Sequence, residues 1–143
     1  MFKKILIASD HAGFDLKQQL IEEMPKDIFE DLGTNSQESV DYTDYANKLA
    51  NIISSDNKKK GILICGTGVG MSLAANKYKN VKAGLAFNSE VAKLIIEHND
   101  ANILILPGRY MNIHEAKKCV DIFLSSKFEG GRHLRRLNKI IKD

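Results

Sequence analysis

Short apolar runs alternate with helical patterns along the whole chain. The apolar runs predict strands at 5–8, 28–33, 61–65, 83–87 and 102–106. Apolar residues recur at helical spacing over 14–24, 42–53, from the glycine loop to 77, and over 89–97, 113–124 and 133–141. This alternation predicts a parallel sheet with helices on both faces, and right-handed crossovers restrict it to the doubly wound, Rossmann-like class. We expect one α/β domain over residues 1–143, with five parallel strands and a basic C-terminal helix at about 132–142.

The composition excludes several other classes of protein. The chain has 143 residues, of which 43% are hydrophobic and 27% charged, as in a globular domain rather than a disordered or collagen-like chain. No apolar run approaches the ~20 residues of a membrane span, and no signal-peptide core precedes the first acidic residue, so we expect a cytoplasmic protein. Cys65 and Cys119 are too few for a disulfide scaffold and lack the partners of a zinc site, which predicts free thiols and no metal.

Positive charge is concentrated at the C-terminus. The net charge is +3, yet residues 130–143 carry five basic residues against one acidic residue, so the rest of the chain is slightly acidic. Three of the four arginines lie at 132, 135 and 136, and the fourth is Arg109. A guanidinium fork suits phosphate or carboxylate, although a solvated basic tail has the same composition. Nucleic acid is a poor partner, because the tail lacks interleaved aromatic residues.

Polar residues follow three of the predicted strands. Ser9-Asp10-His11 comes after the first strand, residues 65–72 after the third, and Pro107-Gly108-Arg109 after the last. Ligands of doubly wound sheets bind beyond the carboxyl ends of the strands. We therefore expect a site there, with Asp10, His11 and His98 as a group of an acid and two histidines in one cleft for proton transfer. His98 ends a predicted helix, a position that also suits a helix cap.

A glycine loop separates the third predicted strand from the helix that follows. It consists of Gly66, Thr67, Gly68, Val69 and Gly70. Alternating glycines let backbone N–H groups converge on an anion, although such turns also serve tight strand–helix packing alone. The spacing matches neither a Walker loop nor the dinucleotide fingerprint, which disfavours ATP and NAD.

The two cysteines have different surroundings in the predicted fold. Cys65 lies at a strand end facing a helix N-terminus, where the thiolate is favoured and can act as a nucleophile or a general base. Cys119 lies within an apolar helical pattern, which indicates a core residue. His114, at the start of the same predicted helix, is expected on the surface.

Arg132 and Arg136 are four residues apart on the final predicted helix. Like charges at this spacing repel, and Arg132 lies at the positive end of the helix dipole. An anion bound between the two guanidinium groups would remove both penalties. The other face of this helix carries an apolar stripe of Leu134, Leu137, Ile140 and Ile141.

Six motifs occur in one order between Ile5 and Arg136. They are residues 9–13, 41–46, 61–70, 74–77, 98–100 and 129–133. The set resembles the successive motifs of the type B ribose-5-phosphate isomerases, whose wider family includes galactose- and allose-6-phosphate isomerases. Thr43 replaces the proline of the common Asp-Tyr-Pro form, which affects the shape of a loop and no chemical role.

The resemblance implies a cofactor-independent aldose–ketose isomerase that works through an enediolate. It implies that Cys65 is the base, that the amides of residues 66–70 bind the enediolate, and that Thr67 relays a proton. His98 would help to open the furanose ring. The implied substrate contacts are Asp10, His11, Asn99, Arg109, Arg132 and Arg136.

Members of this family resemble one another in forming dimers, some of them paired into tetramers, whose active sites are shared between subunits. The C-terminal arginines would then act on the partner's site. A hexose-6-phosphate isomerase, or one subunit of a heteromeric one, is the alternative, although the presence of both Cys65 and His98 favours a self-sufficient catalyst. A nucleotide-binding regulatory module is a more distant alternative, which leaves the arginine cluster unexplained.

Overall fold

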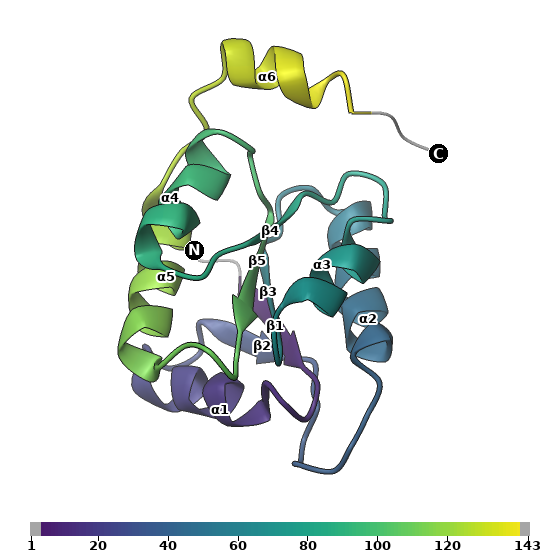
Figure 1. Cartoon of the computed structure of the whole chain (residues 1–143), viewed down its shortest axis with the longest axis vertical. Helices are drawn as coiled ribbons and strands as arrows, with labels where there is room; N and C mark the ends of the chain where they lie inside the picture. Colours follow the sequence, from purple (N-terminus) through teal and green to yellow (C-terminus); the bar gives the residue numbers. More distant parts are fainter. Residues whose placement is uncertain (1–3, 141–143) are drawn as a thin grey trace.

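The computed structural model describes residues 4–140 as one α/β domain (Figure 1). The strands are β1 (Ile5–Ser9), β2 (Phe29–Asp31), β3 (Gly61–Cys65), β4 (Ala83–Leu85) and β5 (Ile103–Pro107). The helices are α1 (Phe14–Glu23), α2 (Tyr42–Ser55), α3 (Val69–Ala75), α4 (Ser89–Glu97), α5 (Ile113–Ser125) and α6 (Arg132–Leu137). The predicted alternation of strands and helices is confirmed.

All five strands run parallel, in the order β2-β1-β3-β5-β4. The chain moves outward from β1 to β2, then crosses to β3 on the other side of β1. The carboxyl ends of β1 and β3 therefore flank the point where the direction of winding reverses. At such a point the connecting loops diverge to opposite faces and leave room for a ligand.

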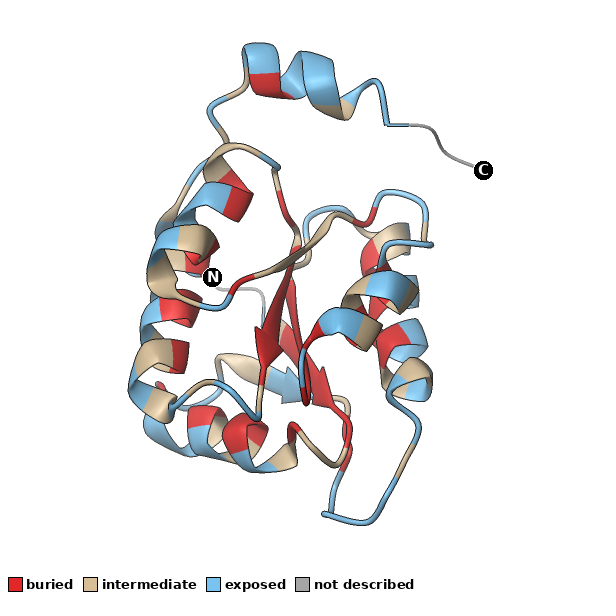
Figure 2. Ribbon diagram, in the orientation of Figure 1, coloured by how far each residue is buried: buried red, intermediate tan, exposed pale blue. Residues whose placement is uncertain are grey.

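Two apolar layers hold helices on the two faces of the sheet. Successive residues of a strand point to opposite faces, so Ile62 and Ile64 pack toward α1, α4 and α5, whereas Leu63 and Cys65 pack toward α2 and α3. Every residue of β3 and β5 is buried, as expected of central strands covered on both sides. Figure 2 shows the same division, with the buried side of the helices turned toward the sheet.

Several predicted elements end earlier than expected, among them the second strand, which was predicted to reach 33 and ends at Asp31. The helix predicted to reach 77 ends at Ala75. The Asn76 side chain then donates to the Ala83 carbonyl and accepts from the Ala83 amide, which directs the chain toward β4. The strand predicted to reach 87 ends at Leu85, because the chain turns to Asn88, which caps α4 through the amide of Val91.

The basic C-terminal helix is also shorter than the predicted 132–142. Helix α6 ends at Leu137, after which the amides of Lys139 and Ile140 donate to carbonyls three residues back and tighten the chain into a turn. The last residues of the predicted helix, including Ile141, lie outside the described part of the chain. None of the described helices is long and apolar enough to cross a membrane.

One charged side chain, Lys17 on α1, is completely buried. Its Nζ lies 2.7 Å from Oδ2 of Asp31, at the end of β2, and 2.9 Å from Oε1 of Gln18. The same Asp31 carboxylate accepts a hydrogen bond from the amide of Gly33. This ion pair ties α1 to the edge strand below the turn that carries Asp10 and His11.

Substituting Asp31 with alanine should lower the free energy of unfolding by about 2–4 kcal/mol, because the Lys17 charge loses its main partner. The expected loss is smaller than for a fully buried pair, since Asp31 is one-third exposed. Urea unfolding followed by circular dichroism measures it. Glu30→Ala, at the exposed neighbouring position of β2, is the control and should change stability by less than about 0.5 kcal/mol. Equal losses in the two variants would contradict a stabilising role of the pair.

Candidate active site

Strand register brings the polar residues after β1, β3 and β5 together at one edge of the sheet. Ser9 pairs with Ile64, and Cys65 pairs with Pro107, so Asp10, Cys65 and Gly108 end neighbouring strands side by side. The Asp10 amide donates to the Ile64 carbonyl, and the Gly108 amide donates to the Cys65 carbonyl. We call this group, together with His11, residues 66–70 and Arg109, the carboxyl-edge site.

Asp10 and His11 are held rigidly at the turn from β1 to α1. Asp10 is buried, and its Oδ1 accepts a hydrogen bond of 3.0 Å from the amide of Gly13. Gly13 allows the turn to pack against β3, because a Cβ there would lie 2.5 Å from the carbonyl oxygen of Ile64. The amide of Val40 donates to His11 Nδ1 at 3.2 Å, which makes Nδ1 the acceptor and leaves the neutral ring's proton on Nε2.

Cys65 is buried at the end of β3, directly before the glycine loop. Its Sγ accepts a hydrogen bond from the amide of Gly68 at 3.2 Å. Gly68 has φ +80°, in the left-handed region that favours glycine, and a Cβ there would lie 2.4 Å from Leu85 Cδ1. The loop therefore needs glycine at 68 to aim an N–H at the Cys65 sulfur.

The amides of the glycine loop are not equally available to an anion. Those of Gly68 and Val69 already donate to Cys65 Sγ and Thr67 Oγ1. Within residues 4–140, the amides of Gly66, Thr67 and Gly70 have no protein acceptor. Two of the five loop amides thus hold the thiol and the Thr67 hydroxyl, and the other three have no partner in the protein.

Arg109 lies against the glycine loop. A Cβ on Gly66 would lie 3.3 Å from Nη1 of Arg109, and the Arg109 amide donates to the Gly66 carbonyl. A cavity of about 430 Å³ opens beside this arginine and is lined by His11, Asp15, Gln37 and Met111 among others. The cavity therefore joins His11 to Arg109, while Cys65 lies outside its lining, next to Gly66.

Tyr42, for which the sequence predicted only a place in a helix and a motif, also lies at this edge. Its ring packs over Gly70, since a Cβ on that glycine would lie 2.5 Å from Tyr42 Cε1. The sequence signal for Tyr42 was its place in the motif at 41–46. In the structure it begins α2, two residues after Val40, whose amide contacts His11. The Tyr42 ring thus covers the glycine loop on the side of α2.

His98 is not in the carboxyl-edge site of its own chain, which corrects the expectation of two histidines in one cleft. Helix α4 begins after β4 and returns to the start of β5, so its C-terminal end lies at the opposite edge of the sheet. His98 caps that end and Asn99 follows it. Only residues that follow strands share the carboxyl edge, whereas His98 follows a helix.

Arg132 and Arg136 lie with His98 rather than with Arg109. Figure 1 shows α6, in yellow, standing apart from the sheet next to the end of α4. Both guanidinium groups are exposed, and within the described residues neither forms an ion pair. The predicted site residues thus form two groups, one at each edge of the sheet, and we call the second group the α4–α6 end.

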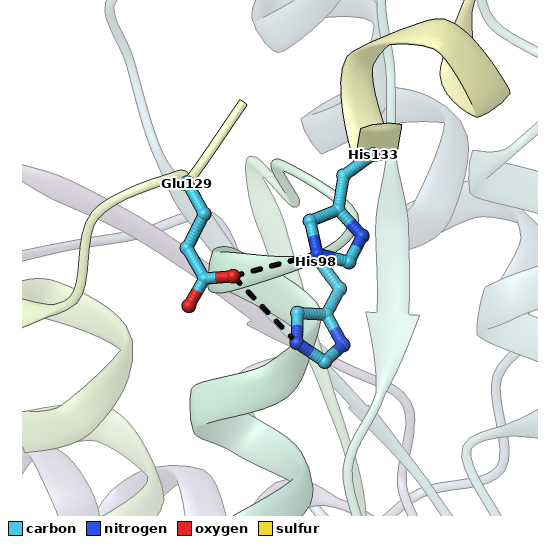
Figure 3. Close-up of side chains that lie close together, drawn as sticks. All are labelled: His98, Glu129 and His133. Carbon is cyan, nitrogen blue, oxygen red and sulfur yellow. Dashed lines mark ion pairs between the residues drawn. The ribbon is translucent and has the colours of Figure 1, made fainter. Parts of the chain in front are cut away.

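Two residues without a predicted role, Glu129 and His133, surround His98. The rings of His98 and His133 stack with centroids 4.2 Å apart and planes at 12°. Oε1 of Glu129 lies 3.4 Å from Nε2 of His133 and 3.9 Å from Nε2 of His98 (Figure 3). Burial lowers the pKa of His133, as do the neighbouring His98, Arg132 and Arg136, against the opposing effect of Glu129. The lowered pKa keeps the His133 ring neutral to a lower pH than an ordinary histidine.

The predicted positions of Cys119 in the core and His114 on the surface are confirmed, and both cysteines are free. Cys119 is fully buried in α5, where burial and the nearby Glu115 carboxylate raise its pKa to about 12, so it remains a thiol. Cys65 and Cys119 are both free. His114 is exposed at the start of α5.

The doubly wound sheet defines the class of the protein as α/β, and a polar group at its carboxyl edge is typical of α/β proteins that bind a ligand at the switch point. Residues 5–140 match the family model described as Ribose/Galactose Isomerase. A probable ribose-5-phosphate isomerase B from Mycoplasma pneumoniae is 45% identical, over 96% of this chain and 92% of the relative. The ribose-5-phosphate isomerase B of Escherichia coli is 40% identical, over 96% and 94%.

Solved structures agree over the same length. The crystal structure of a ribose 5-phosphate isomerase from Thermotoga maritima is 50% identical with a TM-score of 0.88, and the match covers 95% of each chain. Ribose-5-phosphate isomerase B from Mycoplasma genitalium, with bound ribulose-5-phosphate, is 44% identical with the same TM-score, over 96% of this chain and 93% of that one. The chain belongs to the ribose/galactose isomerase family.

Proposed function

We propose that this protein interconverts ribose 5-phosphate and ribulose 5-phosphate. The observation that carries the proposal is the carboxyl-edge site, where register sets Asp10, Cys65 and Arg109 on adjacent strand ends. It combines a candidate base, open amides and an arginine, which are the groups that proton transfer next to a carbonyl in a sugar phosphate requires. The solved relative with bound ribulose-5-phosphate supports the choice of sugar.

In the proposed reaction, the Cys65 thiolate takes the proton from carbon 2 of the open-chain aldose. The electron pair of that C–H bond forms the double bond between carbons 1 and 2, and the carbonyl oxygen becomes the oxyanion of an enediolate. The amides of Thr67 and Gly70 stabilise this oxyanion. The thiol returns its proton to carbon 1, and the Thr67 hydroxyl passes the proton of the carbon 2 hydroxyl to the oxyanion on carbon 1, which gives the ketose without any redox partner.

The other predicted residues bind the substrate in this proposal. Asp10 and His11 contact the sugar and phosphate, and Arg109 contacts the phosphate from beside the cavity that it shares with His11. His98, with Asn99, protonates the ring oxygen when the furanose opens. Arg132 and Arg136 complete the phosphate site, which removes the repulsion between their exposed guanidinium groups.

We further propose that each active site contains residues of two subunits. The α4–α6 end is at the wrong edge of the sheet to reach the carboxyl-edge site of its own chain. Exposed apolar side chains, including Val69, Leu73, Phe87 and Tyr110, surround the carboxyl edge and would be covered by a second copy. A homodimer that places the α4–α6 end of one subunit over the glycine loop of the other brings both groups together.

The experiment that tests the function is an assay of the purified chain alone on ribose 5-phosphate, allose 6-phosphate and galactose 6-phosphate. Turnover of ribose 5-phosphate with the highest kcat/KM supports the proposal. Faster turnover of a hexose phosphate replaces it with the family's other activity, and a chain that turns over none of the three contradicts it. Titration with AMP and ATP tests the nucleotide-binding alternative, which requires saturable binding.

Exhaustive treatment with EDTA should leave the rate unchanged. The proposed oxyanion stabilisation comes from backbone amides, so no step needs a bound cation. Initial rates before and after treatment, with residual metal measured by mass spectrometry, check this expectation. A reproducible loss of rate that a divalent ion restores would contradict the mechanism.

Replacing Arg136 with alanine should raise KM roughly tenfold or more, because one charge-assisted hydrogen bond contributes about 1.5–3 kcal/mol. The value of kcat should fall less if the phosphate is bound equally in the ground and transition states. Steady-state kinetics with ribose 5-phosphate provide both constants. Arg135→Ala is the matched control, because this exposed neighbour on α6 has no proposed contact with substrate. Equal effects of the two substitutions would argue against a specific role of Arg136.

A further inference from the structure

The α4–α6 end contains a compact group of metal-ligating side chains. His98, Glu129 and His133 each offer one ligand atom, and these atoms all lie within 4.8 Å of one another. Figure 3 shows one carboxylate oxygen of Glu129 facing Nε2 of both histidines. No other such group of three is present within residues 4–140.

His133 has an unsatisfied nitrogen that points into this group. The residue is only 7% exposed, and its Nε2 is buried without a hydrogen-bond partner among the described residues. A buried polar atom left without a partner costs free energy, and in a native structure it often indicates an ion or a water. Here the nearest charged group is the Glu129 carboxylate at 3.4 Å, on the side from which a cation would approach.

The backbone holds Glu129 and His133 against the end of α4. The amide of Glu129 donates to the carbonyl of Glu97, one residue before His98. Between the two ligands, Gly130 and Gly131 have φ of +71° and +58°, which bends the chain so that both side chains turn toward His98. Two of the three ligands are thus positioned by the fold rather than by chance contact on an open surface.

We propose that His98, Glu129 and His133 form a binding site for a zinc ion. Two imidazole nitrogens and one carboxylate oxygen suit this ion, with a fourth position left open. Neighbouring ligand atoms around a tetrahedral zinc are roughly 3.3 Å apart, given bonds of about 2.0–2.1 Å. Glu129 and His133 already have this spacing at 3.4 Å.

His98 must tilt out of its stack with His133 to complete the site. The lone pair of an imidazole nitrogen lies in the plane of its ring, so two nearly parallel rings cannot both point a nitrogen lone pair at the same ion beside Glu129. The His98 side chain is 38% exposed and caps a helix end, so this rotation needs no change in the core.

The site has a consequence for catalysis, which rests on the proposed role of His98. A metal-bound imidazole nitrogen no longer carries or accepts a proton, so an occupied site withdraws His98 from ring opening. Zinc is therefore an inhibitor of the isomerase and not a cofactor. This inhibition agrees with the expectation that removing metal with EDTA leaves the rate unchanged.

Binding is tested on the EDTA-treated full chain by calorimetric titration with ZnCl2 alone, and by visible absorption with CoCl2. We expect one ion per chain and the d–d bands of tetrahedral cobalt. His133→Ala and Glu129→Gln should each weaken binding at least tenfold. Glu129 is half-exposed, so its substitution keeps the test valid if His133→Ala disturbs α6. His114→Ala and Cys65→Ala are the controls and should bind as the unmodified chain does.

Three results would overturn the site. They are no saturable binding at millimolar zinc, unchanged binding in both ligand variants, or loss of binding in Cys65→Ala, which would place the ion on the thiol. Inhibition is measured separately, as the zinc concentration that halves the rate, which Glu129→Gln should raise at least tenfold. The calorimetric titration measures zinc binding without measuring turnover, so it tests the zinc site even if the chain has another activity.

Discussion

Cys65→Ala should reduce kcat by at least a factor of about 10², and by up to ~10⁴, while the protein still binds sugar phosphate. General base catalysis contributes about this much to a rate, and alanine removes the only thiol at the carboxyl-edge site. Binding should persist because the proposal assigns the phosphate to other groups, Arg109, Arg132 and Arg136. Steady-state kinetics give the rate, and calorimetry with ribose 5-phosphate gives the affinity.

Cys119→Ala is the matched control for this prediction. Both cysteines are buried, yet Cys119 lies in the core of α5 with a pKa of about 12, so it supplies no thiolate at neutral pH. Its substitution should cost stability and leave kcat within about twofold of the unmodified enzyme. A loss of less than tenfold in Cys65→Ala, or equal losses in the two variants, would exclude Cys65 as the base.

Mixing Cys65→Ala with Arg132→Ala/Arg136→Ala should restore activity if the active site is shared, measured at a substrate concentration near the KM of the unmodified enzyme, where each variant alone is nearly inactive. Cys65→Ala lacks the base, and Arg132→Ala/Arg136→Ala lacks the arginines of α6. A mixed dimer then has one site with the intact Cys65 of one subunit and the intact arginines of the other. Random exchange of equal amounts makes about half of the dimers mixed, so about a quarter of the original activity should return.

The measurement needs evidence that the subunits have exchanged. Native mass spectrometry of one variant labelled with heavy isotopes shows the mixed dimer directly. The same mixture made from Cys65→Ala and a chain carrying all three substitutions should stay inactive, because no pairing restores a base. Absence of recovery after exchange has been observed would show that each site is built within one chain, and would refute the arrangement proposed from the two separated groups.

The order of the elements was predictable because each strand and helix is specified by local spacing of apolar residues. Strand β3 and helix α4 begin and end at the predicted residues, and β5 is displaced by one residue. The carboxyl-edge site was predictable for the same reason, since any residue that directly follows a parallel strand must lie at that edge. Asp10, His11, Cys65 and Arg109 needed only this topological rule.

Contacts between residues distant in the sequence were not predictable in this way. The end of α3 depends on the hydrogen bonds between the Asn76 side chain and the backbone of Ala83 in β4. The burial of Lys17 beside Asp31 appears only when α1 packs over the edge strand. In each case the partner residue lies on another element and comes close only when the two elements pack together. The spacing of apolar residues along the chain carries no information about that contact.

The sequence by itself determined the doubly wound sheet and the residues of the carboxyl-edge site, because helix and strand periods and the parallel crossover leave few topologies. Only the tertiary structure decided that His98 and the arginines of α6 lie at the opposite edge, because the direction of α4 carries its end away from the strand ends. It also decided that Glu129 and His133 surround His98, through the left-handed glycines between them. Proximity of this kind depends on where elements pack, which no local pattern specifies.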